Sequence, residues 1–105
     1  MSWLYLLIAS IFEVGWPFGM KMASLSENKT IWFIFAIIAM TLSGLFLYLA
    51  QKQIPIGIAY AIWTGIGAVC TFILGAWVFH DTVNTTKIFG VSLIILGIVL
   101  LEISQ

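Results

Sequence analysis

Apolar residues dominate four stretches of this chain, and short polar segments separate them. The apolar stretches cover about residues 3–23, 31–50, 58–79 and 87–103. Each is close to the ~20 residues that an α-helix needs to cross the hydrocarbon core of a bilayer. The sequence therefore predicts an all-α membrane protein with four transmembrane helices.

The connections between these stretches are short and contain residues typical of turns. Pro55 and Gly57 mark the second connection, where such residues interrupt helical structure. Short connections make neighbouring helices antiparallel, so both termini are expected on the same side of the membrane. We therefore treat residues 1–105 as a single four-helix transmembrane domain.

Composition supports lipid as the solvent. The chain is 63% hydrophobic and only 8% charged, whereas soluble domains carry about 25% charged residues. The chain has no basic patch, which argues against nucleic acid as a partner. The residues Met1-Ser2-Trp3 supply no basic side chain for a signal peptide, so the first apolar stretch is interpreted as a retained helix.

Lysines are spread almost evenly between the two predicted sides of the membrane. Lys21, Lys29 and Lys87 lie on one side, against Lys52 and the terminal amine on the other. Basic residues set membrane orientation, so this small difference gives only a weak preference. A chain with little preference can insert in both orientations, which would permit an antiparallel dimer made from one sequence.

Glu13 is the one carboxylate in the uncharged apolar run from Trp3 to Met20. An ionised carboxylate near the centre of a transmembrane helix costs about 2.5 kcal/mol or more, and residues this costly usually mark ion or proton pathways. The structural alternative is a protonated carboxyl that hydrogen-bonds a neighbouring helix. Because low dielectric disfavours the charged form of a carboxyl group, we expect Glu13 to bind and release protons.

Trp16 follows Glu13 by about one helical turn. Its indole N–H can donate to the carboxylate and its ring can stack on a flat cation, with apolar packing as the alternative. Gly15 and Gly19 have the small-xxx-small spacing that permits close helix packing. Pro17 weakens the backbone hydrogen bonding of the same helix beside Glu13.

The third apolar stretch contains aromatic residues and glycines at close spacing. Tyr60 and Trp63 are three residues apart, so both can face the interior of the protein together. Gly65 and Gly67 predict a flexible or bent point in this helix. The alternative is an interfacial aromatic residue with ordinary close packing.

Two further features concern helix contacts. Ser43 places a hydroxyl at membrane depth, where it can bond either to Glu13 or to a carbonyl of its own helix. Gly90 and Gly97 are seven residues apart and share one face of the fourth stretch. A glycine-lined face predicts a helix–helix contact, with a contact between subunits as one option.

The sequence contains no pattern typical of a metal, cofactor or enzyme site. His80 has no neighbouring His or Cys, so no metal ion is expected. We find neither a nucleophile–base pair nor a phosphate-binding loop. We therefore expect no cofactor and no enzymatic activity.

The size of the chain favours a dimer. Four helices can barely enclose a ligand cavity, whereas two copies supply eight helices and two Glu13 carboxylates. Two nearby carboxylates repel when both are ionised, and a cation can replace the protons that relieve this repulsion. Protons and a cation then compete for one negative site. If the loaded site can face either side of the membrane in turn, a proton gradient drives export.

Two motifs resemble one known family. The run Ile11-Phe12-Glu13-Val14-Gly15-Trp16, followed by Met20-Lys21, resembles the first helix of the small multidrug resistance family. The run from Ile54 to Gly67 is similar to the third-helix signature of that family. The resemblance covers essentially the whole chain, including its length and its four-helix layout.

This resemblance implies a bacterial inner-membrane protein that works as an antiparallel, dual-topology homodimer and exchanges protons for organic cations by alternating access. It implies that Glu13 of each subunit forms the shared proton and substrate site, that Tyr60 and Trp63 line this site, and that Ser43 hydrogen-bonds the carboxylate. The same resemblance implies that the third helix bends at Gly65 to Gly67 and that the fourth helix makes the dimer contact at Gly90 to Gly97.

The residues divide between two branches of this family. Trp16 and the run from Thr64 to Ala68 resemble the guanidinium exporters, whereas the run from Gly57 to Tyr60 is more similar to the quaternary-ammonium multidrug branch. Ser10 and Pro17 depart from the usual guanidinium-exporter pattern.

A planar guanidinium ion donates several N–H groups in a fixed plane, which suits a pair of carboxylates. We expect guanidinium or a small substituted guanidinium ion as substrate, with export of quaternary ammonium and other multidrug cations as the alternative. Pairing with a different partner chain, as a heterodimer, is a further option. A non-transporting membrane scaffold or accessory subunit is the alternative from another functional class.

Overall fold

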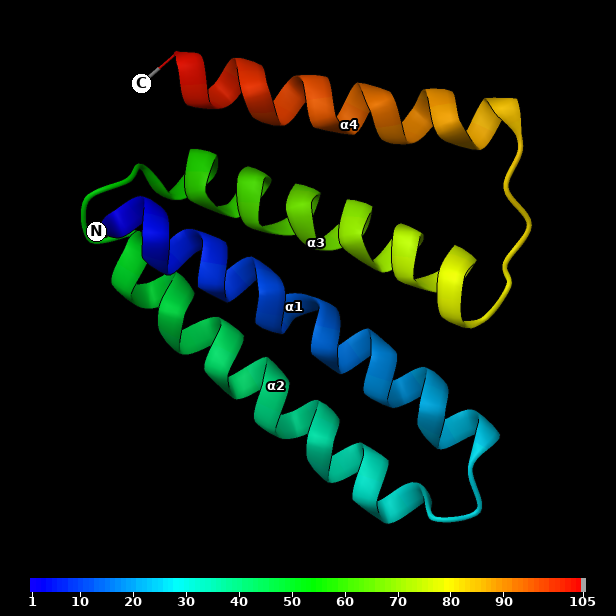
Figure 1. Ribbon diagram of the computed structural model, residues 1–105. Coiled ribbons are helices and arrows are strands. Elements are labelled where there is room, and N and C mark those ends of the chain that lie inside the picture. The colour runs from blue at the N-terminus through cyan, green and yellow to red at the C-terminus, as the bar shows by residue number, and fades with distance from the viewer. Residues whose placement is uncertain (105) are drawn as a thin grey trace.

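The computed structural model describes residues 1–104, and these form four α-helices joined by short connections (Figure 1). The helices are α1 (Ser2–Leu25), α2 (Lys29–Ala50), α3 (Ile56–Val78) and α4 (Thr85–Ile103). All four are long and apolar enough to cross a membrane, which confirms the predicted fold class. The predicted bounds agree with the observed ones to within two residues at each end.

Local chemistry explains where two of the helices begin. Pro55 is the N-cap of α3, and its fixed φ together with its missing N–H suits the entry to a helix. At α4, the Asn84 side chain accepts a hydrogen bond from the backbone N–H of Lys87 at 2.9 Å. This cap satisfies one of the free donors of the first turn, so the helix starts at Thr85, before the apolar stretch itself.

The helices lie in the order α2, α1, α3, α4 across a flat molecule (Figure 1). The molecule measures 45 × 35 × 17 Å along its principal axes. Because α1 packs against both α2 and α3, a side chain near the middle of α1 can meet both neighbours. Both termini and the α2–α3 connection lie at one end of the molecule, and the other two connections lie at the opposite end.

Small residues bring α1 and α2 close together. A Cβ atom built on Gly15 would lie 2.8 Å from the Ala39 Cβ atom, and one on Gly19 would lie 3.1 Å from the Ala36 Cβ atom. Most of the buried apolar residues in the described chain are alanines. This is the expected form of packing inside a membrane, where lipid is as apolar as the helix surfaces and close van der Waals contact drives association.

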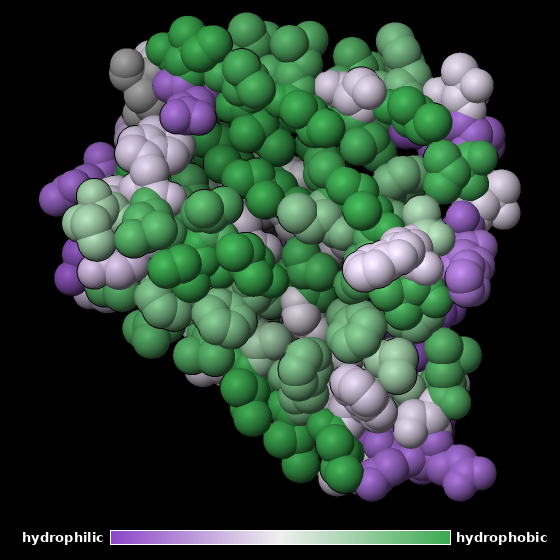
Figure 2. All heavy atoms as spheres, in the orientation of Figure 1, coloured by the Kyte–Doolittle hydropathy of each residue, from purple (hydrophilic) through white to green (hydrophobic). Residues whose placement is uncertain are grey.

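The outer surface is largely apolar. Figure 2 shows hydrophobic residues over the middle of the visible face and hydrophilic residues gathered toward the two ends. α4 contributes strongly to this surface, since none of its residues from Thr85 to Ile103 is buried in the described chain. A water-soluble protein would not leave such a surface uncovered, whereas lipid or a second copy can cover it.

Candidate functional site

Glu13 lies midway along α1, partly buried between α2 and α3. The indole N–H of Trp16 donates a hydrogen bond to the Glu13 carboxylate. The two residues are three apart on one helix, so the local geometry of α1 brings them together. The structure thus places a preorganised N–H donor on the acid, as the spacing in the sequence predicts.

A second set of hydrogen bonds joins three helices one turn before Glu13. Ser43 of α2 donates to the main-chain carbonyl of Ala9 of α1 at 2.7 Å. Trp63 of α3 donates its indole N–H to the Ser43 hydroxyl at 2.8 Å and lies 3.3 Å from the Ala9 carbonyl oxygen. Ser43 is fully buried, and these contacts satisfy its hydroxyl as both donor and acceptor.

The Ser43 hydroxyl makes its shortest hydrogen bond to a neighbouring helix, a partner that its sequence context does not suggest. Its hydroxyl lies 3.5 Å from the Glu13 carboxylate, which is the outer limit of a hydrogen bond. A hydroxyl has one hydrogen to donate, and the shorter bond to Ala9 takes it. Ser43 therefore positions the helices around Glu13 more strongly than it binds the carboxylate in this conformation.

A hollow of about 410 Å³ lies beside the acid. Tyr60 and Trp63 line it together, and their ring centroids are 5.3 Å apart. Their spacing of three residues on α3 brings both rings to this hollow, and Tyr60 is the more exposed of the two. The full lining consists of Glu13, Trp16, Met40, Gly44, Tyr60, Trp63 and Thr64. Four of the five predicted binding residues thus line one hollow, and the fifth, Ser43, holds Trp63 in place.

α3 lies close to the acid at Gly67. A Cβ atom built there would lie 2.7 Å from Glu13 Cγ and 3.2 Å from Glu13 Cβ. Gly67 and Glu13 also line a second hollow of about 290 Å³, together with Pro17, Thr64, Ala68 and Thr71. The absence of a side chain at Gly67 is therefore what lets α3 approach the carboxylate.

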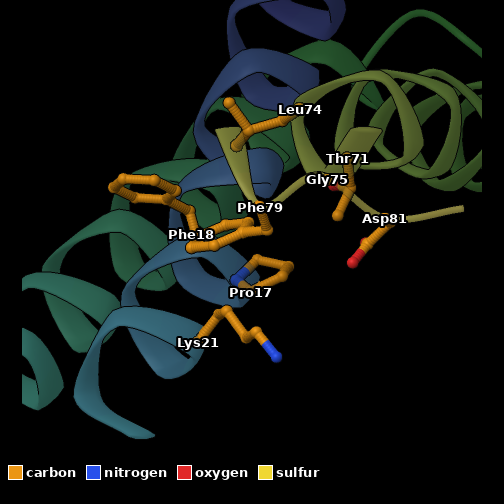
Figure 3. A pocket seen from close by; sticks show the side chains of 8 residues that line it. All are labelled: Pro17, Phe18, Lys21, Thr71, Leu74, Gly75, Phe79 and Asp81. Carbon is orange, nitrogen blue, oxygen red and sulfur yellow. The ribbon is translucent and has the colours of Figure 1, made fainter. Parts of the chain in front are cut away.

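A third hollow, of about 190 Å³, lies where α1 approaches the end of α3 and the α3–α4 connection. Figure 3 shows Lys21, Pro17 and Asp81 around this hollow, with the aromatic rings of Phe18 and Phe79 nearby. The Nζ atom of Lys21 lies 5.9 Å from the centroid of the Phe79 ring.

Shared residues connect these hollows in a row. The first two share Glu13 and Thr64, and the second and third share Pro17 and Thr71. The row therefore leads from the partly buried acid to exposed Asp81 beyond the end of α3.

The predicted hinge residues lie in a continuous helix. α3 runs unbroken from Ile56 to Val78 through Gly65 and Gly67. A Cβ atom on Gly65 would lie 3.0 Å from Ile98 Cδ1, so in this conformation Gly65 serves the contact between α3 and α4.

The predicted dimer contact lies on the surface. Cβ atoms built on Gly90 and Gly97 would meet nothing within 4 Å in the described part of the chain. Both glycines are therefore free of the contacts that α4 makes inside the subunit, and a partner can reach them.

The structure adds lining residues that the sequence did not indicate. They are Met40 and Gly44 of α2, Thr71 with its hydroxyl, and Asp81 with its carboxylate. Thr71 follows Thr64 by seven residues, so helical spacing could have placed it on the same face. Met40 carries no such signal, because apolar lining residues look like lipid-facing ones in an apolar helix.

Comparison with known proteins identifies the family. Residues 1–94 match the family described as Small Multidrug Resistance protein. A guanidinium exporter of Yersinia pestis is 38% identical over 105 residues, which is the whole of both chains. Guanidinium exporters of Escherichia coli (strain K12) and Salmonella typhimurium are 38% and 40% identical over 104 residues, or 99% of this chain and 98% of theirs.

These matches cover the acid, its tryptophan partner and all four helices. The relatives are named as exporters, and the four apolar helices give the chain a membrane-spanning architecture. The chain belongs to the small multidrug resistance family and is a multi-pass protein of the bacterial inner membrane.

Proposed function

We propose that this protein exports small organic cations in exchange for protons, with guanidinium or a small substituted guanidinium ion as its substrate. One observation carries the proposal: the Glu13 carboxylate lies within a membrane-spanning helix, bonded to the Trp16 indole, at the wall of a hollow of about 410 Å³. The names of the relatives support guanidinium as the substrate.

The exchange rests on competition for one negative charge. A protonated Glu13 is neutral and suits the apolar interior of the membrane. When it releases its proton, the carboxylate is left uncompensated, and binding a cation restores neutrality. The Trp16 N–H supports the ionised form, because a hydrogen bond to a charged acceptor is stronger than one to a neutral acceptor.

The walls of the hollow suit a flat cation that donates hydrogen bonds. Guanidinium groups stack on aromatic faces and bind carboxylates through paired N–H groups. The site offers both kinds of surface, since Tyr60 and Trp63 line the same hollow as Glu13.

A second candidate is export of quaternary ammonium ions. Met40 and Gly44 provide an apolar part of the same wall, and a quaternary ammonium ion needs apolar contact more than hydrogen bonds. Transport of guanidinium should therefore depend on the Trp16 N–H more than transport of quaternary ammonium ions does. This difference allows an experiment to distinguish the two substrates.

The shape of the subunit supports a dimer as the working unit. At 17 Å, its shortest dimension is less than the width of two side-by-side helices, which are about 10–12 Å each. Such a flat array cannot surround a cation on all sides. A second copy in the opposite orientation would close the cavity and bring a second Glu13 to it. The weak lysine bias permits both orientations.

Alternating access completes the mechanism. The dimer opens its shared site to one side of the membrane at a time, loaded with either protons or the cation. The flexible point at Gly65 and Gly67 would allow α3 to change shape during this motion. The row of hollows from Glu13 to Asp81 suggests the course of one opening.

Uptake by proteoliposomes under an imposed pH gradient tests the proposed function. Glu13→Gln keeps the size of the side chain and removes its titration, so we expect loss of proton-driven guanidinium transport. Glu13→Asp keeps a carboxyl group, and transport should persist with an altered pH dependence. Glu102→Gln removes an exposed acid on α4 and is the matched control. Full transport by the Glu13→Gln variant would remove the carboxylate from the mechanism.

The choice of substrate has its own test. Trp16→Gly should weaken transport of guanidinium more than transport of tetrapropylammonium, because only guanidinium depends on an oriented hydrogen-bonding carboxylate. Trp77→Phe, at an exposed position of α3, controls for general effects of changing a tryptophan. Equal losses for both ions would mean that Trp16 fills space and does not select the substrate.

A further inference from the structure

Pro17 changes the hydrogen bonding of α1 at the acid itself. In an α-helix, the carbonyl of residue i accepts a hydrogen bond from the N–H of residue i+4. Pro17 lies inside α1, and residue 17 is the partner that the Glu13 carbonyl would use. Proline has no N–H. The main-chain carbonyl of Glu13 therefore lacks its helical donor.

Two neighbouring hydroxyl donors serve other acceptors. Thr64 donates to the Tyr60 carbonyl at 2.8 Å, and Ser43 donates to the Ala9 carbonyl. The Trp16 indole donates to the Glu13 carboxylate, not to its carbonyl. A carbonyl without a donor is costly at membrane depth, where water does not reach it from lipid. Irregular backbone at this depth is tolerated where it is buried in protein or lines a water-filled cavity.

The second hollow lies where this carbonyl is available. Helix carbonyls point along the axis toward the residue four positions later. Glu13 and Pro17 both line the hollow of about 290 Å³, and the freed carbonyl lies between these two residues along α1. Gly67 lines the same hollow from α3, and its missing side chain leaves the space open.

We propose that the main-chain carbonyl of Glu13, freed by Pro17, is a second ligand for the transported cation. It accepts one N–H of a guanidinium ion whose other N–H groups bond to the Glu13 carboxylate. A quaternary ammonium ion has no N–H and gains nothing from this oxygen. Pro17 thereby determines substrate specificity through the carbonyl that it frees. This inference rests on the proposed function, since it concerns the same cation and the same acid.

Pro17→Ala tests the inference by restoring the missing N–H. We expect guanidinium affinity to fall about tenfold, the usual effect of losing one hydrogen bond to a charged group. Affinity for tetrapropylammonium should stay within about twofold, since that ion makes no such bond. Equal changes for the two ions would overturn the proposal.

A second substitution separates the free carbonyl from the effect of the proline ring on helix shape. Replacing residue 17 by the α-hydroxy analogue of alanine, through chemical ligation, creates an ester that lacks both the N–H and the ring. This variant should retain the guanidinium affinity of the parent protein. If it loses as much affinity as Pro17→Ala, the ring matters and the carbonyl does not.

Infrared spectroscopy gives a direct readout that needs no substitution. A carbon-13 and oxygen-18 label on the Glu13 carbonyl isolates its amide band in the intact protein. Saturating guanidinium should lower the frequency of this band, whereas tetrapropylammonium at the same pH should leave it unchanged. An unshifted band at saturation would overturn the inference while leaving the proposed function intact. Failure of the parent protein to bind guanidinium at all would instead overturn the proposed function.

Discussion

Trp63 of α3 donates its indole N–H to the Ser43 hydroxyl of α2 across 2.8 Å, and this bond meets α1 at the Ala9 carbonyl. Three helices are thereby tied together one turn before Glu13. The single buried hydroxyl of Ser43 thereby sets the position of Trp63 in the wall of the site. The role of Ser43 in positioning Trp63 can be tested separately from direct contact with a cation.

Ser43→Ala should reduce guanidinium affinity about fivefold. The substitution removes the acceptor of the Trp63 N–H, and a net hydrogen bond contributes about 1 kcal/mol. Trp63 should also become more mobile. Calorimetric titration with guanidinium measures the affinity.

Ser10→Ala is the control for this experiment. Ser10 is as deeply buried as Ser43, but its hydroxyl bonds only to the Leu6 carbonyl of its own helix at 2.8 Å. We expect affinity close to that of the unmodified protein. A similar loss in both variants would show that burial of any serine matters, and that the bond to Trp63 does not.

Gly67→Ala should impair transport severely. The new methyl group would lie 2.7 Å from Glu13 Cγ, so either the acid or α3 must move. Overpacking of this kind costs about 1–3 kcal/mol, which corresponds to a loss of roughly five- to 150-fold in affinity if it falls on the bound state. Calorimetric guanidinium binding and thermal unfolding in detergent together show whether the cost falls on the site or on the fold.

Gly57→Ala is the matched control, since a Cβ atom there meets nothing within 4 Å in the described residues. Both changes add one methyl group to a glycine of α3. Unimpaired transport by the Gly67→Ala variant would show that the close approach of α3 to Glu13 is dispensable.

Asp81→Asn should slow guanidinium uptake about two- to fivefold at low ionic strength. Asp81 lines the outermost of the three hollows, and a carboxylate at the mouth of a path attracts cations toward it. The effect should vanish near 1 M salt, where the screening length is about 3 Å. Initial uptake rates at several salt concentrations provide the measurement.

Glu27→Gln makes the same change of charge in the α1–α2 connection, at the same end of the molecule but away from the hollow (Figure 1). It should leave uptake nearly unchanged. Equal slowing in both variants would assign the effect to the general surface charge and would exclude a specific role for Asp81.

Gly97→Leu should disrupt the proposed dimer without disturbing the subunit. A Cβ atom at Gly97 would meet nothing within 4 Å in the described chain, so the subunit leaves room for the start of a larger side chain there. Energy transfer between labelled subunits in liposomes would show reduced association. Ser92→Leu places the same side chain on the opposite side of α4 and is the control. Unchanged association of the Gly97→Leu variant would place the dimer contact elsewhere.

The sequence by itself determined the helices and the identity of the acid. Apolar length alone predicts four spans, because a membrane leaves the backbone few alternatives to a helix. Glu13 is evident because a charge in an apolar run is costly. Its contact with Trp16 is also predictable, since residues three apart on a helix share a face.

Only the tertiary structure decided how residues from different helices meet. Ser43 donates to Ala9 and lies at the limit of hydrogen bonding to Glu13, and this choice depends on the rotation and depth of α2 against α1. Gly65 contacts Ile98 of α4, which the local pattern of glycines could not reveal.

The physical reason is that periodicity describes one helix at a time. In a uniformly apolar helix, the residues that face lipid, a partner subunit or a cavity have the same composition. The sequence pattern therefore does not indicate which helix face packs against which neighbour. The relative rotation of the helices is set by close contacts of small residues such as Gly15 and Gly67. Differences of a few tenths of an ångström decide whether these contacts fit, and only the folded structure contains them.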